Sequence, residues 1–226
     1  DASFLAGGHS LIPAMKLRLA EPGTLVDIAG IDDLKGISRD GDTIHIGALT
    51  THAEVESSDV VKEACAALAE AAGKIGDPQV RNRGTIGGNV AHADPASDYP
   101  GILMALGATV VTSSRSIAVD DFFTGLFETA LNEGEVIKEI QVPSLSEGSG
   151  AAYAKFFNPA SRYAVVGIGA VVTMDNGSCS SCSIGVTGAA SHAFRASAAE
   201  DVLTRSDLGE DAITAAAAKV AEGKEM

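Results

Sequence analysis

The sequence predicts an α+β fold, and three features of its 226 residues support that class. The first half alternates short β-branched runs with segments of helical periodicity. The second half is richer in strand-like runs, and two of them flank Asp175-Asn176-Gly177, where Asn-Gly is a strong hairpin signal. After Ala190 the pattern becomes helical. We therefore expect a mixed first part, a strand-rich second part and a helical end.

In the first half, an apolar strand-like run stops at Gly7-Gly8, and β-branched runs predict further strands at 24–31 and 43–49. A helix is expected over 57–73, because it begins with a Ser/Asp cap signal, keeps apolar residues at helical spacing and ends at Gly73. The segment 76–98 is rich in Gly, Pro, Asn and Asp and is expected to be a loop. A short buried helix at 99–108 and a strand at 108–114 follow.

In the second half, strands are expected at 135–143, 151–157, 164–174 and 181–190, and Pro143 ends the first of them. Helical patterns cover 197–204 and 211–223. The glycine- and serine-rich stretch 148–150 marks a boundary, which divides the chain into a domain at 1–148 and a smaller domain at 149–226.

The composition excludes several classes of protein. A net charge of −14, from 30 acidic and 16 basic residues, argues against binding to a nucleic-acid backbone. No run approaches the roughly 18 apolar residues of a membrane span. Three cysteines are too few for a four-thiolate iron–sulfur cluster and suit a reducing compartment, so we expect a cytoplasmic location. A peripheral position at the inner face of the membrane stays open. The chain lacks an initiator Met and begins almost inside a strand, so we expect its N-terminus to be truncated.

Two glycine-containing loops, AGGHS at 6–10 and TIGGN at 85–89, are the candidate binding elements. Paired glycines allow positive φ angles and lack Cβ atoms, so successive N–H groups can converge on phosphate oxygens. Two such loops suit a pyrophosphate, and Ser10, Thr85 and Asn89 would add side-chain donors. Each loop taken alone is as well explained by a tight turn. Neither matches the dinucleotide-binding or the P-loop fingerprint.

The loops belong to the longer motifs AGGHSLIPAMKLRLAEP (6–22) and RNRGTIGGNVAHADPASDYP (81–100). With YAVVGIGA (163–170) and the helical end, these motifs resemble the FAD-binding medium subunit of molybdenum-containing carbon monoxide dehydrogenases. More broadly, they are similar to the flavin domain of the xanthine dehydrogenase (molybdopterin dehydrogenase) family. The resemblance implies a two-subdomain PCMH-type FAD-binding fold followed by a smaller C-terminal α+β domain. Members of the family are longer, so truncation is expected at both ends.

The resemblance also implies which residues bind FAD. The two loops would hold its diphosphate, Asp98 would contact a ribose, Ile137 and Lys155 would lie near the isoalloxazine, and Tyr163 would shield that ring. The implied cofactor-binding residues are Ala6, Gly7, Gly8, His9, Ser10, Thr85, Ile86, Gly87, Gly88, Asn89, Asp98, Ile137, Lys155 and Tyr163. No catalytic residue and no metal ligand is assigned, because the flavin itself would carry the chemistry.

By resemblance, the chain is an oxidoreductase subunit whose partners are a molybdenum-cofactor large subunit and a 2Fe–2S small subunit. It would collect electrons on FAD and pass them to an external acceptor. Related complexes acting on aldehydes, purines or N-heterocycles remain open, as does a flavin reductase that uses a nicotinamide donor. A non-redox module that binds a diphosphate ligand is the alternative from another class.

Cys179 and Cys182 form a CxxC pair, which in other proteins serves redox or zinc chemistry. Both cysteines fall on the outgoing arm of the predicted hairpin. Residues i and i+3 of a regular strand face opposite sides, so joint ligation is not expected.

Overall fold

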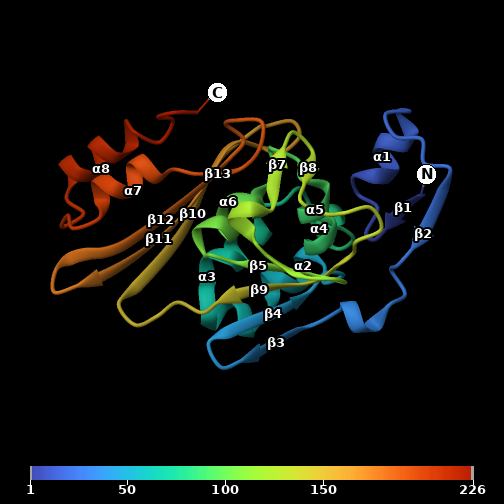
Figure 1. Ribbon diagram of the computed structural model, residues 1–226, viewed down its shortest axis with the longest axis horizontal. Helices are drawn as coiled ribbons and strands as arrows, with labels where there is room; N and C mark the ends of the chain where they lie inside the picture. Colours follow the sequence, from blue (N-terminus) through green and yellow to red (C-terminus); the bar gives the residue numbers. More distant parts are fainter. Residues whose placement is uncertain (1, 225–226) are drawn as a thin grey trace.

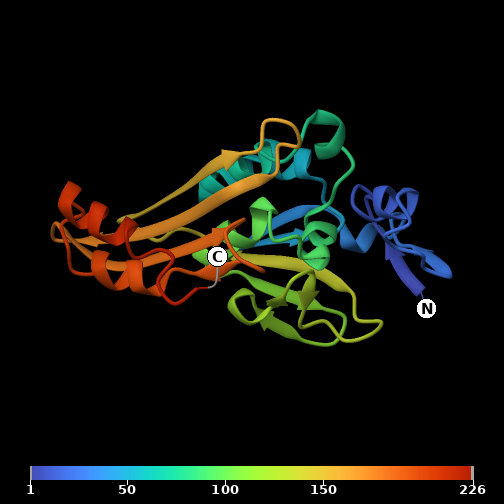
Figure 2. The same ribbon diagram turned by 90° about the horizontal axis from the view of Figure 1, so that it is seen from above.

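The structure is a computed structural model that describes residues 2–224. It is elongated, with the N-terminal segment at one end and the last two helices at the other, and the helices between them pack between two antiparallel sheets (Figure 1). Figure 2 shows the same arrangement from above. Within residues 2–224, no helix is long and apolar enough to cross a membrane.

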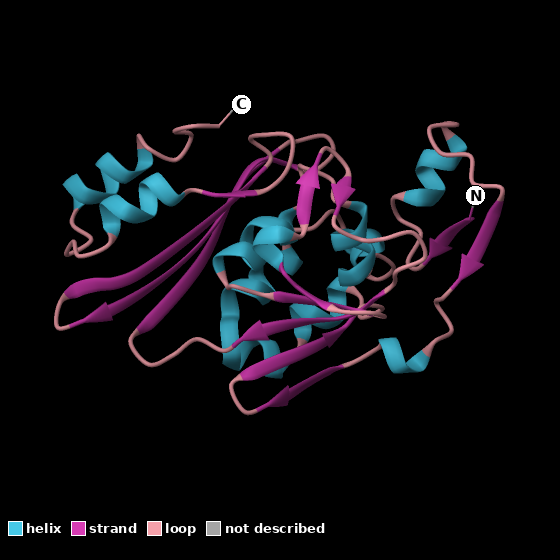
Figure 3. Ribbon diagram, in the orientation of Figure 1, coloured by secondary structure: helices cyan, strands magenta, loops and turns pink. Residues whose placement is uncertain are grey.

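The strands form four sheets, drawn in magenta in Figure 3. A five-stranded sheet has the order β3-β4-β9-β5-β6 and a four-stranded sheet the order β10-β11-β12-β13, while β1-β2 and β7-β8 are separate pairs. Only β1 and β2 pair in parallel among the described strands. The strands are β1 Ala2–Leu5, β2 Thr24–Asp27, β3 Ile37–Asp40, β4 Thr43–Gly47, β5 Thr109–Thr112, β6 Ser116–Ala118, β7 Phe123–Gly125, β8 Glu128–Thr129, β9 Ile137–Pro143, β10 Ser149–Phe157, β11 Ala164–Asp175, β12 Ser178–Thr187 and β13 Phe194–Arg195.

The helices occupy three regions of the chain. α1 follows the first strand, five helices lie in the middle, and two close the C-terminal end. Their bounds are α1 Leu11–Lys16, α2 His52–Ser57, α3 Asp59–Gly73, α4 Pro78–Arg81, α5 Ile86–His92, α6 Asp98–Ala105, α7 Ser197–Leu203 and α8 Glu210–Ala217, with 3-10 helices at η1 Asp32–Leu34 and η2 Val119–Asp121.

Helix α6 is buried along its whole length because it packs on β11 and β12 as well as on α3. Glycines allow this close approach: a Cβ atom on Gly185 would lie 2.0 Å from the carbonyl oxygen of Gly101. One core cluster continues from the five-stranded sheet through α3 and α6 to Tyr153 of β10. The first and second parts of the chain therefore share a packed interior.

The predicted α+β class is confirmed. The helix expected over 57–73 corresponds to α3 with its Ser58 cap, but it is not continuous, because Cys65 has a non-helical backbone (φ −161°, ψ 91°) that kinks it. The hairpin at Asn176-Gly177 is confirmed too, with positive φ angles of 49° and 80° at those residues. The expectation of a loop over 76–98 is wrong, because α4 and α5 lie within it. Asp77 and Thr85 cap these two helices by accepting bonds from Val80 and Gly88.

The expectation that Cys179 and Cys182 face opposite sides of their strand is wrong. The pairing register of β11 and β12 shifts between Thr173 and Met174, which leaves an extra residue on β12. Cys179 then pairs with Met174 and Cys182 with Val172, so the bulge brings both cysteines to the same face of the sheet. Within residues 2–224, no group of three or more His, Cys, Asp or Glu residues could hold a metal ion.

Candidate functional site

A cavity of about 510 Å³ lies where the N-terminal segment meets α2, α5 and the start of β9. It falls within the usual range of small-molecule and cofactor sites. Twelve of the predicted residues line it: Ala6, Gly7, Gly8, His9, Ser10, Thr85, Gly87, Gly88, Asn89, Asp98, Ile137 and Tyr163. The fold thus brings together segments that are distant in the sequence.

The loop at 6–10 presents unused hydrogen-bond donors to this cavity. Gly8 has a φ of +74°, and its carbonyl accepts the first helical bond of α1 from Ile12 at 3.1 Å. No described residue accepts a bond from the backbone amides of Gly8, His9 or Ser10. Because these residues line the cavity, their N–H groups are available to an anionic ligand.

The loop at 85–89 is built differently, since it forms the start of helix α5. The amides of Ile86 and Gly87 donate to the carbonyls of Thr50 and Ala48, at 3.0 and 2.9 Å. Those of Gly88 and Asn89 donate to the side chain and the carbonyl of Thr85. The expectation that both loops offer a set of free N–H groups is therefore wrong for this loop. It contributes a wall and polar side chains instead.

The glycines also let the two loops pack against each other and against the core. A Cβ atom on Gly7 would lie 2.0 Å from the carbonyl oxygen of Arg83, and one on Gly87 would lie 2.4 Å from Cβ of Ala48. Such separations are far below van der Waals contact. Both positions require glycine whether or not a ligand is bound.

Asp98 lines the cavity, but its carboxylate already accepts hydrogen bonds from two side chains of strand β10. Tyr153 donates its hydroxyl to Oδ1 at 2.6 Å, and Lys155 donates Nζ to Oδ2 at 2.8 Å. Burial raises the pKa of Asp98, against the lowering effect of Lys155 and Tyr153. Lys155 is itself buried and also donates to the carbonyl of Lys74 at 2.9 Å.

Lys155 and Ile86 both lie outside the cavity lining, so their predicted contacts with a cofactor gain no support from it.

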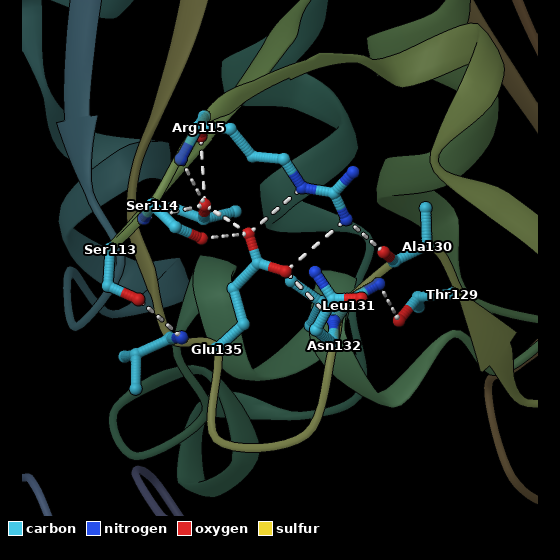
Figure 4. A network of polar contacts seen from close by, with 10 residues as sticks. Ser113, Ser114, Arg115, Thr129, Ala130, Leu131, Asn132 and Glu135 are labelled. Carbon is cyan, nitrogen blue, oxygen red and sulfur yellow. Dashed lines mark hydrogen bonds and ion pairs between the residues drawn. The ribbon is translucent and has the colours of Figure 1, made fainter.

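The wall that includes Ile137 is held in place by a buried carboxylate (Figure 4). Glu135 accepts bonds from the side chains of Thr112, Ser114 and Arg115 and from the amide of Asn132. The Arg115 guanidinium is the first of the causes that hold the pKa of Glu135 well below its usual range. Leu131, Glu135, Val136 and Ile137 all line the cavity. By holding Glu135 in place, the network therefore fixes the segment 131–137 as one side of the cavity.

Two features of the site escaped sequence reasoning. The sequence pattern predicts Glu135 only as part of a strand and does not single out His52, although both residues line the cavity. Thr51-His52-Ala53-Glu54 does carry a capping-box pattern, and both bonds of the box are present. That pattern places His52 at the first turn of α2 but does not reveal what its ring contacts.

The residues present fit an elongated ligand with a diphosphate at its centre. Free amides at 8–10 supply donors for the phosphates, and the cavity lining also contains apolar side chains for ring systems: Leu49, Ile75, Val80, Leu131, Val136 and Ile137. FAD has this construction, with a ring system at each end of a diphosphate. The fold and the cavity define the class of an FAD-binding flavoprotein.

Comparison with known proteins agrees with this class. The family "FAD binding domain in molybdopterin dehydrogenase" matches residues 1–145, and "CO dehydrogenase flavoprotein C-terminal domain" matches residues 151–225. The chain is 41% identical to the carbon monoxide dehydrogenase medium chain of Hydrogenophaga pseudoflava, over 96% of this chain and 77% of that protein. It is also 41% identical to the 6-hydroxypseudooxynicotine dehydrogenase complex subunit alpha of Paenarthrobacter nicotinovorans, over 99% and 77%.

Among solved structures, carbon monoxide dehydrogenase from Hydrogenophaga pseudoflava superimposes with a TM-score of 0.96 at 42% identity, covering 99% of this chain and 79% of that one. The chain belongs to the molybdopterin dehydrogenase FAD-binding family. It is an FAD-binding oxidoreductase subunit, as the resemblance implied, with an electron-transfer role.

Proposed function

We propose that this chain is the flavoprotein subunit of a molybdenum hydroxylase complex, most similar to the medium subunit of carbon monoxide dehydrogenase. A molybdenum-cofactor large subunit and a 2Fe–2S small subunit would be its partners. When bound, FAD supplies the redox chemistry, exchanging electrons between the iron–sulfur subunit and an external acceptor. The protein's own part is to bind and orient the cofactor and to exclude water from it.

The observation that carries this proposal is the set of free amides at Gly8, His9 and Ser10 facing a cavity of about 510 Å³. We assign the diphosphate to these amides, with Thr85 and Asn89 of the neighbouring loop in the same lining. Ile137 and Tyr163 would contact the flavin ring, and Asp98 a ribose hydroxyl. Because Lys155 is bound to Asp98, we assign Lys155 a role in orienting that carboxylate.

The substrate of the complex is a separate question. Relatives at the same 41% identity are named for carbon monoxide and for 6-hydroxypseudooxynicotine. Two such different substrates at equal identity support the view that another subunit selects the substrate. The rival functions, a flavin reductase with a nicotinamide donor and a non-redox diphosphate-binding module, have no observation in the structure that favours them.

We further propose a cytoplasmic location and a division of the chain at 148/149. Three free cysteines support the first proposal. The second is supported by β10, which begins at Ser149.

The test is the visible absorption spectrum of the purified chain before and after FAD is added. Stoichiometric flavin that is released as FAD on denaturation supports the proposal. A chain that stays colourless with excess FAD, although circular dichroism shows it folded, contradicts it. Stoichiometric binding of ADP by such a chain would favour the non-redox diphosphate-binding module.

A further inference from the structure

The side chain of His52 is a buried polar group that the protein leaves without a partner. Only 3% of the residue is exposed, and Nδ1 has no hydrogen-bond partner. The imidazole lies against the ring of Tyr99, with centroids 5.3 Å apart and the ring planes tilted by 58°. Buried polar groups in folded proteins are nearly always paired, so a buried imidazole that bonds no described residue through either nitrogen, next to a binding cavity, points to a ligand.

Nε2, the other nitrogen of the ring, also bonds no described residue, and unlike Nδ1 it is not fully buried. His52 donates its backbone N–H to the carbonyl of Gly84 at 3.0 Å, which fixes the start of α2 against this segment. A Cβ atom on Gly84 would lie 2.6 Å from Nε2 of His52, so the imidazole fills the space beside that α-carbon. Both residues line the cavity.

The imidazole is neutral, and its surroundings decide which nitrogen carries the proton. Burial, together with the nearby charges of His9 and Arg81, lowers the pKa of His52 to about 4. A buried N–H without a partner is rarer in proteins than an unused acceptor. The tautomer that leaves no fully buried N–H unpaired has Nδ1 unprotonated and the proton on Nε2.

We propose that His52 is a cofactor-binding residue that donates its Nε2–H to an acceptor atom on one of the two ring systems of FAD. This inference rests on the function proposed above. His52 shares the cavity lining with the apolar residues Ile75 and Val80, and a single donor there would fix the orientation of a flat heteroaromatic group. Ring nitrogens of adenine and ring nitrogens or carbonyls of isoalloxazine share this acceptor chemistry.

The experiment measures FAD affinity of the full chain by flavin fluorescence for the wild type, His52→Phe and His52→Gln. Phe keeps the ring volume without a donor, and the Gln amide can replace Nε2–H. We expect the dissociation constant to rise about tenfold in His52→Phe, the scale of one hydrogen bond, and to recover within about threefold in His52→Gln. The matched control is His45→Gln on β4, because His45 lies outside the cavity and pairs with Glu139.

Competition with ADP and with FMN shows which ring system accepts the bond. His52→Phe should lose affinity for ADP if the acceptor is on adenine, and for FMN if the acceptor is on isoalloxazine. A measurement without substitution is the ¹⁵N resonance of His52 Nε2 in the wild type, which should shift when FAD is added.

Unchanged FAD affinity in His52→Phe, a loss that Gln does not reverse, or an unmoved ¹⁵N resonance would each overturn the inference. A wild-type chain that is folded but binds no FAD would overturn the proposed function together with it. A wild type that binds FAD while His52→Phe binds it equally well would overturn the inference alone.

Discussion

Gly8 combines a positive φ of 74° with a tight environment, since an added Cβ atom would lie 2.7 Å from Cδ1 of Ile12. Gly8→Ala should lose about 1–2 kcal/mol of unfolding free energy from backbone strain and should also bind FAD less tightly. Gly107→Ala is the matched control, because Gly107 has a φ of 63° and nothing within 4 Å. Denaturant unfolding should show a loss in both variants, and fluorescence titration a lower affinity in Gly8→Ala only. Equal FAD affinity in the two variants would argue against the loop assignment.

His52 should make the stability of the chain depend on pH. Its folded-state pKa of about 4 lies below the ordinary value of 6.5, so the unfolded chain binds a proton first as the pH falls. The unfolding free energy should therefore decrease between pH 6.5 and 4, by roughly 3 kcal/mol. Chemical denaturation across this pH range should show this decrease in unfolding free energy in the wild type and not in His52→Gln. A parallel decline in both proteins would assign the pH dependence to other groups.

At the scale of elements, the turn between β5 and β6 stabilises the cavity wall through Glu135. The carboxylate joins Thr112, Ser114 and Arg115 of this turn to the amide of Asn132. Glu135→Gln should accelerate hydrogen exchange at Asn132 and Val136 and weaken FAD binding. Glu133→Gln, an exposed neighbour, is the control.

The Glu135 effect should also depend on pH, because its folded-state pKa is lowered. Its stabilising contribution is present above the ordinary pKa of 4.5 and is lost as the pH falls through the lower folded-state value. Wild type and Glu135→Gln should therefore converge in stability in strong acid. A difference that stays constant from neutral to acid pH would contradict a charge-based role.

For the whole molecule, the contact of α6 with β11 and β12 holds the two parts together. Gly185→Ala should force the helix away from the sheet, because the new Cβ atom would lie 2.0 Å from the carbonyl oxygen of Gly101. Overpacking of this kind costs about 1–3 kcal/mol, which denaturant unfolding can measure. Gly150→Ala on β10 is the matched control, because nothing lies within 4 Å of its added Cβ. Equal stability of the two variants would show that α6 can shift without cost.

Much of the site could be predicted from local patterns. The paired glycines at 7–8 and 87–88 identified both segments of the cavity, because glycine tolerates positive φ and close backbone approach. Sequence reasoning failed where a partner is distant in the chain. Lys155 meets Asp98 across 57 residues, and the free or satisfied state of an amide depends on carbonyls such as those of Ala48 and Thr50.

By itself, the sequence determined the α+β class, most strands and helices, the hairpin and the two glycine-containing segments. Those features follow from periodicity, turn residues and caps, which act over a few neighbouring residues. Only the tertiary structure decided which loop keeps free donors, that Lys155 binds Asp98, that His52 faces the cavity and that a bulge turns Cys179 and Cys182 to one face. These depend on the register and packing of segments far apart in the chain, which local patterns do not encode.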